Sequence, residues 1–142
     1  ISEAKLDYNY DFVTLLIGVN NQYQGRPFSQ YEKEFITLLD SAILFAQSDP
    51  KKVFVLSIPD YYFTPFGQEQ KSERVSEEID GYNAYAKSVC DSHNVTFIDI
   101  TPISRRGIQE PELVAEDGLH PSGSQYKLWA EKLLIEMGSL PR

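Results

Sequence analysis

Three short apolar runs, separated by long stretches with helical periodicity, constrain the fold of this 142-residue chain more than any other feature. The runs are FVTLLI at 12–17, VFVLSI at 53–58 and VTFIDI at 95–100. Continuous apolar runs of this length are typical of strands buried on both faces of a parallel sheet. Strands that alternate with long helices imply crossover connections whose helices cover the sheet. The sequence therefore predicts an α/β fold, a three-layer α/β/α domain with a parallel sheet.

The segments between and after these runs predict three helices. They cover residues 29–47, 72–92 and 122–137. Two of them open on the spacing of a capping box, with a serine followed three positions later by Glu or Gln: Ser29 and Glu32, then Ser122 and Gln125. The middle helix is indicated by an apolar stripe at helical spacing.

The remaining segments are expected to be loops. Residues 59–70 are rich in aromatic and turn-forming residues, and residues 101–121 contain one expected helical turn around 111–115. No repeat, linker or low-complexity segment interrupts the chain. Residues 1–142 are therefore expected to form a single domain, a normal size for one hydrophobic core.

Composition excludes several classes of partner. The net charge is −8, and the only adjacent basic pairs are Lys51-Lys52 and Arg105-Arg106, so nucleic acid and anionic membranes are not expected partners. No apolar run approaches the roughly 18 residues of a membrane span. Cys90 is the single cysteine, which rules out an intrachain disulfide, and its place in a helix favours a buried apolar role. The cellular compartment stays open.

Polar residues follow the predicted strands, where ligands bind in open parallel sheets. The three candidate segments are 18–25, 59–68 and 99–122. In the first, Asn20 and Asn21 place carboxamide donors at the end of a strand, and such donors can stabilise an oxyanion without titrating. A plain Asx turn explains the same two residues, because asparagine favours turns.

The third segment contains EDGLHPS, in which Asp117 and His120 are separated by a glycine and a leucine. On a tight turn the carboxylate can fix the tautomer of the imidazole and leave its other nitrogen free for proton transfer. The alternative is a solvated acidic loop with an incidental histidine. His93 is expected at a helix end, where a cation suits the helix dipole. No metal-binding motif accompanies either histidine, so neither a metal nor a cofactor is expected.

The second segment is aromatic. Tyr61, Tyr62, Phe63 and Phe66 could form a wall for an acyl chain or a sugar. They could equally pack beneath a long loop, and the sequence does not separate these alternatives.

An apolar strand running into GVNN, followed about 100 residues later by DGLHPSG, resembles blocks III and V of the SGNH (GDSL) hydrolase family. The resemblance extends over essentially the whole chain. It implies a flavodoxin-like three-layer fold and hydrolysis of esters through an acyl-enzyme. On the matching positions Asn20 would be an oxyanion donor, His120 the general base and Asp117 its orienting partner. The family usually has aspartate where this chain has Asn21, which removes a charge beside the oxyanion hole.

Two further blocks of the family are missing from the sequence. None of the serines follows Gly-Asp, and Ser57, the serine nearest a predicted strand end, is expected to be a core hydroxyl. Residues 1–10 look like the tail of an interrupted helix. The chain therefore resembles an SGNH hydrolase lacking its first strands and its nucleophile: an esterase, lipase or carbohydrate deacetylase for a small ester or an acylated carbohydrate. A non-catalytic binding or assembly module on the same fold is the alternative.

The strand at 12–17 has a further consequence. Residues 53–58 can pair with one of its edges, but nothing in the chain before it provides a strand for the other edge. An unpaired apolar edge is a site for pairing with another chain. We expect this strand to mediate self-association or to bind a missing N-terminal segment.

Overall fold

The computed structural model describes residues 6–70, 72 and 74–138. Its sheet consists of β1 (Val13–Leu15), β2 (Val53–Leu56) and β3 (Thr96–Ile98). The strands lie in the order β1-β2-β3 and both pairings are parallel. The predicted parallel sheet is confirmed, although each strand is shorter than its apolar run.

Six α-helices and three 3-10 turns surround the sheet in the described residues. They are α1 (Val19–Tyr23), α2 (Phe28–Phe45), α3 (Pro65–Gln70), α4 (Arg74–His93), α5 (Thr101–Ser104), α6 (Gly123–Gly138), η1 (Pro50–Lys52), η2 (Tyr61–Phe63) and η3 (Pro111–Leu113). The prediction that 59–70 and 101–121 are mostly loop was wrong at η2, α3 and α5. Prolines in the first turns of α3 and α5 have a backbone angle already suited to a helix start.

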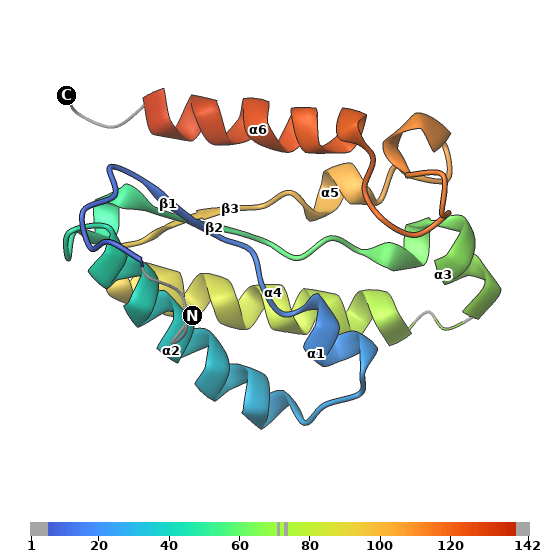
Figure 1. The fold of residues 1–142 in the computed structure, drawn as a ribbon. Coiled ribbons are helices and arrows are strands. Elements are labelled where there is room, and N and C mark those ends of the chain that lie inside the picture. The colour runs from blue at the N-terminus through green and yellow to red at the C-terminus, as the bar shows by residue number, and fades with distance from the viewer. Residues whose placement is uncertain (1–5, 71, 73, 139–142) are drawn as a thin grey trace.

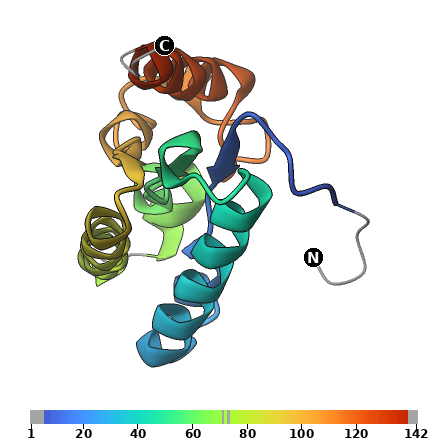
Figure 2. The same ribbon diagram turned by 90° about the vertical axis from the view of Figure 1, so that its left-hand side faces the viewer.

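The helices form two layers around the sheet (Figures 1 and 2). Figure 1 shows α6 along one face and α2 and α4 along the other. Side chains of β2 alternate between the layers: Val53 and Val55 pack with α2 and α4, and Phe54 packs against Trp129 of α6. Val53, Phe54 and Val55 are all buried, which confirms the three-layer α/β/α fold.

The two predicted capping boxes differ in outcome. The prediction at Ser29 was wrong, because α2 begins at Phe28 after Pro27, no side chain caps it, and Ser29 lies inside its first turn. The prediction at Ser122 holds in part. Its hydroxyl accepts a hydrogen bond from the Gln125 N–H at 3.3 Å, but the Gln125 side chain donates to the carbonyl of Leu113 instead.

The start of the described chain is not helical. Residues 6–10 form no helix, so the interpretation of 1–10 as a helical tail was wrong there, and residues 1–5 lie outside the described residues. The Tyr10 N–H donates to the carbonyl of Phe45, which ties this segment to the end of α2. Among the described residues, no helix is long and apolar enough to cross a membrane.

The structure places Cys90 and His93 in the structural positions that the sequence predicts. Cys90 is fully buried in the cluster between α2, α4 and the sheet, and this burial raises the pKa of its thiol to about 12. His93 ends α4 and its Nδ1 lies 2.8 Å from the carbonyl oxygen of Val89.

Candidate active site

The chain leaves β1 through Gly18 and enters α1 directly. Gly18 has φ 126°, and a Cβ there would lie 2.7 Å from Cε2 of Tyr31. The N–H groups of Asn21 and Gln22 donate to the carbonyl of Gly18. The turn expected at GVNN is therefore the first turn of a short helix, in which successive side chains point in different directions.

Helical geometry separates the two candidate asparagines. Asn20 is exposed and lines a cleft together with His120. Asn21 is buried, its amide donates to Glu34 Oε2 at 2.8 Å, and it lines a different hollow beside Lys33. The structure brings Asn20 to the candidate site and places Asn21 away from it.

Asp117 and His120 form the contact that their spacing predicts. Asp117 Oδ2 lies 2.6 Å from His120 Nδ1, and Asp117 Oδ1 accepts the N–H groups of Leu119 and His120, both at 2.9 Å. Those two N–H groups, followed by the imidazole, lower the pKa of Asp117 to about 2. The carboxylate is therefore ionised at neutral pH and holds the proton on Nδ1, which leaves Nε2 free to accept another.

The backbone of this loop is fixed at both ends. Val114 and Pro121 form an isolated antiparallel bridge, and the Ala115 N–H donates to the carbonyl of His120. Gly118 adopts φ 73°, a region that glycine enters without strain, and its carbonyl accepts the N–H of Phe66 in α3. The loop thus presents His120 on a braced turn although both side chains of the pair are exposed.

A cleft of about 290 Å³ joins the segments that follow β1 and β2 to this loop. Its lining residues are Val19, Asn20, Tyr23, Pro59, Tyr61, Leu119, His120 and Pro121. Asn20 and His120, 100 positions apart in the sequence, therefore share one cleft at the carboxyl ends of the strands, as predicted. Apart from these two, the lining is mostly apolar.

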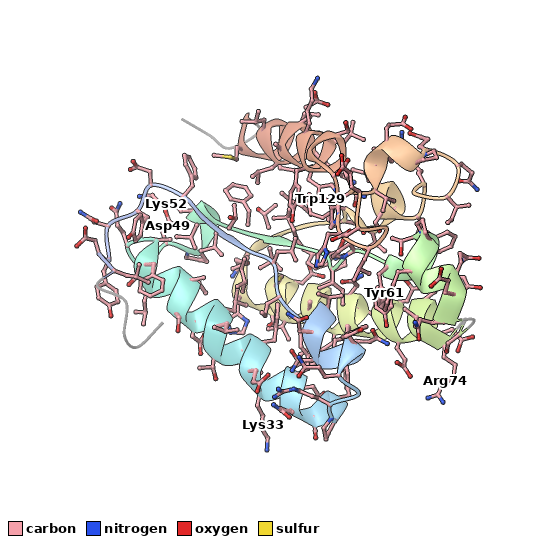
Figure 3. All side chains as sticks on the ribbon, turned by 45° about the vertical axis from the view of Figure 1, so that its right-hand side comes forward. Lys33, Asp49, Lys52, Tyr61, Arg74 and Trp129 are labelled. Atoms are coloured by element: carbon pink, nitrogen blue, oxygen red, sulfur yellow. The ribbon has the colours of Figure 1, made fainter. Side chains whose placement is uncertain are left out.

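The aromatic loop fits both interpretations that the sequence left open, a wall of the cleft and packing against the core. Tyr61 lines the cleft, and Figure 3 shows it between α1 and α3. Tyr61 and Tyr62 both pack against the core, and Phe63 lies edge-on to Tyr62 at 5.5 Å between ring centroids. Tyr23, which lines the cleft beside Tyr61, was missed by the sequence analysis because α1 was not recognised as a helix. It follows Asn20 by three positions, the spacing of one helical turn.

Ser57 is not a nucleophile in this arrangement. It is 1% exposed, its hydroxyl donates to Asp99 or Thr101, and it accepts the N–H groups of Ile100 and Thr101. The prediction of a core hydroxyl is confirmed. Within the described residues, no serine, threonine or cysteine lines the cleft, and no cluster of His, Cys, Asp or Glu is placed to hold a metal ion.

The structure therefore places an oriented imidazole and a carboxamide together at the carboxyl edge of a parallel sheet, where open α/β sheets bind ligands. The family model of the GDSL-like lipase/acylhydrolases matches residues 2–128. The chain belongs to this family. A comparison with curated protein sequences finds no match.

Solved structures with the same fold come from the same family and from related esterases. A member of the lipolytic G-D-S-L family from Veillonella parvula has a TM-score of 0.66 at 21% identity, covering 98% of this chain and 69% of its own. The acetylxylan esterase of Geobacillus stearothermophilus has a TM-score of 0.62 at 23% identity, covering 92% of this chain. This chain spans 60% of the length of that esterase. At these identities the likeness shows the fold.

Proposed function

We propose that this chain carries the acid–base and oxyanion-binding part of a serine ester hydrolase. His120 is the general base, Asp117 orients it, and Asn20 donates to the oxyanion. The observation that carries the proposal is the shared cleft, in which Asn20 faces the same space as an imidazole whose Nδ1 is already bound to Asp117. Membership of the lipase/acylhydrolase family supports it.

The reaction then has the two steps of acyl transfer. A serine outside the described residues attacks the ester carbonyl while His120 Nε2 takes its proton, and the Asn20 amide donates to the oxygen that becomes negative. His120 then gives this proton to the departing alcohol, and the acyl group remains on the serine as an acyl-enzyme. Water, deprotonated by His120, releases the acid and regenerates the serine.

The substrate we propose is a small uncharged ester or an acylated carbohydrate. A mostly apolar cleft with two polar groups suits a neutral ester, and the net charge of −8 disfavours polyanionic substrates. The acetylxylan esterase among the structural relatives acts on an acylated carbohydrate, which is compatible with this class. No step requires a cofactor.

We also propose a partner for the edge of the sheet. Among the described residues β1 pairs with β2 alone, and this leaves one edge without a strand. We propose that β1 pairs there with a second copy or with a segment that brings the nucleophile.

A second function is favoured by one observation, the absence of any hydroxyl or thiol among the described residues that line the cleft. A non-catalytic binding or assembly module would use the same cleft without acyl transfer. The nucleotide sequence upstream of the Ile1 codon separates the two. An in-frame Gly-Asp-Ser segment supports the hydrolase, and an initiation codon at that point supports the binding module.

The direct experiment measures hydrolysis of p-nitrophenyl acetate by the full natural gene product. We expect His120→Ala to lower kcat by on the order of 10³-fold or more, and Asn20→Ala by about 10²-fold to 10³-fold. His93→Ala is the matched control, since His93 is the other histidine and lies at the far end of α4. Equal activity of His120→Ala and His93→Ala would contradict the proposal. Residues 1–142 alone should be about a thousandfold less active than the complete site, or worse.

A further inference from the structure

The turn η2, which follows β2, is preceded by a buried carboxylate, that of Asp60. Asp60 is fully buried, and its Oδ2 accepts a hydrogen bond from Arg105 Nε at 2.9 Å. Its Oδ1 accepts the N–H of Tyr62 at 3.1 Å, and its own N–H donates to Ser104 Oγ at 2.8 Å. A buried charge is tolerated only with such partners, so Asp60 ties the start of η2 firmly to the end of α5.

The other side of the same turn is packed without free space. The carbonyl of Tyr61 accepts the hydroxyl of Thr64 at 2.7 Å. A Cβ on Gly67 of α3 would lie 2.0 Å from that carbonyl oxygen, and a Cβ on Gly107 would lie 2.5 Å from the carbonyl of Phe63. Backbone is in direct contact with backbone on both sides, so η2 cannot shift without moving α3 or the segment after α5.

This fixed turn holds Tyr61 against the helix that carries the oxyanion donor. The rings of Tyr61 and Tyr23 are 5.7 Å apart and meet edge to face at 78°. Tyr23 follows Asn20 on α1, so this aromatic corner lies on the Asn20 side of the cleft. The carbonyl carbon carries the oxyanion in the proposed reaction, so the corner formed by Tyr23 and Tyr61 borders the carbon to which the acyl chain is attached.

We propose that the Asp60–Arg105 ion pair positions Tyr61 as a rigid wall that restricts the acyl group beside Asn20 to a short chain. This inference rests on the proposed ester hydrolase function and narrows its substrate class to esters of short acids. The cleft of about 290 Å³ is slightly smaller than the range of volumes found for small-molecule pockets, about 300–1,000 Å³. A wall on a mobile loop could yield to a longer chain, whereas these contacts hold the backbone of Tyr61 in place.

Binding of methyl esters tests the wall without requiring hydrolysis. The full natural gene product, carrying His120→Ala to prevent hydrolysis, is labelled with 3-fluorotyrosine, and the Tyr61 and Tyr23 signals are followed by ¹⁹F NMR as methyl acetate, butyrate or hexanoate is added. In an open groove each added CH₂ would raise affinity about fourfold. We expect the opposite, with hexanoate binding at least tenfold more weakly than butyrate. Hexanoate binding as tightly as butyrate, or no ester moving either signal, overturns the proposal.

Two variants separate the wall from its support. Tyr61→Ala should remove the preference for short esters, as reported by the Tyr23 signal. Asp60→Asn should move the Tyr61 signal before any ester is added and weaken the preference, while the signal of the buried Tyr31 stays in place and reports an intact core. Asp80→Asn is the matched control, because Asp80 is the exposed partner of the same Arg105. An unchanged Tyr61 signal in Asp60→Asn overturns the positioning role, and if that variant does not fold, Tyr61→Ala decides.

The outcome is distinguishable from failure of the proposed function. Hydrolysis that depends on His120 but shows no acyl-length preference contradicts only the proposed role of Tyr61, and the proposed hydrolase function stands. A short-ester preference at Tyr61, in a natural gene product whose hydrolysis does not depend on His120, contradicts the proposed catalytic role of His120 and leaves the ester-binding role of the cleft.

Discussion

The two faces of the sheet differ in how completely the chain covers them. On the face toward α2 and α4, the side chains of β1 and β2 join one continuous cluster that includes the fully buried Phe35 and Leu39. On the opposite face α6 covers β2 and β3 through Trp129, which points from the helix toward the sheet (Figure 3). No helix among the described residues covers β1 on this face, and Phe12 and Leu16 are 47% and 37% exposed.

The uncovered flank and the candidate site adjoin the same strand. Within the part of the chain that the structure describes, β1 has an unpaired edge and an uncovered outer face, and it continues through Gly18 directly into α1 with Asn20. The segment or second copy that we propose to pair with β1 would also cover this apolar flank. The comparison of the two faces therefore raises the question of what covers Phe12 and Leu16. In the proposed hydrolase, the same segment could supply the nucleophile.

The largest expected effect concerns association through the open flank. We expect purified 1–142 to run as a dimer or larger species rather than as a monomer of 16.2 kDa, because an unpaired apolar edge favours pairing. Phe12→Lys with Leu16→Lys should restore the monomer, since charges on an edge oppose pairing. Size-exclusion chromatography with light scattering measures it. A stable monomer whose amides at 12–17 are all protected from hydrogen exchange would show that the edge is closed in another way.

Truncation of one phenylalanine on each face sharpens the comparison. Phe35→Ala should cost about 3–5 kcal/mol, because it leaves a cavity in the closed layer. Phe12→Ala should cost well under half of that in the monomeric form, because about half of its surface is exposed. Urea unfolding of both variants, made in the Leu16→Lys background, gives the two values. Similar costs would mean that Phe12 is covered in solution.

Gly18 joins the closed layer to the candidate site, and its substitution should have a smaller effect. Gly18→Ala places a Cβ 2.7 Å from Tyr31 in a residue with φ 126°, so we expect a loss of about 1–3 kcal/mol. Gly25→Ala is the control, because Gly25 also has positive φ but nothing lies within 4 Å of the added Cβ. The difference between the two variants in thermal or urea unfolding isolates the contact with Tyr31.

The smallest effect concerns the exposed pair on the site loop. Since folding lowers the pKa of Asp117 to about 2, the stabilisation that its ionised form provides is present above the unfolded-state pKa near 4 and is lost as pH falls toward 2. Asp117→Asn should therefore lower the unfolding midpoint slightly at pH 6 and not at pH 2. Urea midpoints at the two pH values measure this. A difference that persists at pH 2 would assign it to something other than the charge.

Several features were predictable because they depend on neighbours in the sequence. Apolar runs of strand length between helical stretches led to the parallel sheet and its layers. Asp117 and His120 could be paired because three positions on a tight turn bring a carboxylate within reach of an imidazole whatever the rest of the chain does. The Ser122 cap is local for the same reason, and the burial of Cys90 follows from its position on an apolar stripe.

The tertiary structure decided which side chains point into the cleft. Asn20 and Asn21 are adjacent and chemically identical, and Glu34 on α2 binds only the second. Tyr61 and Tyr62 both pack against the core, but only Tyr61 lines the cleft, and the preceding residue, Asp60, is held by Arg105, 45 positions away. Such choices depend on contacts between segments distant in sequence. Local periodicity carries no information about these contacts, since each becomes available only when the sheet brings its strand ends together.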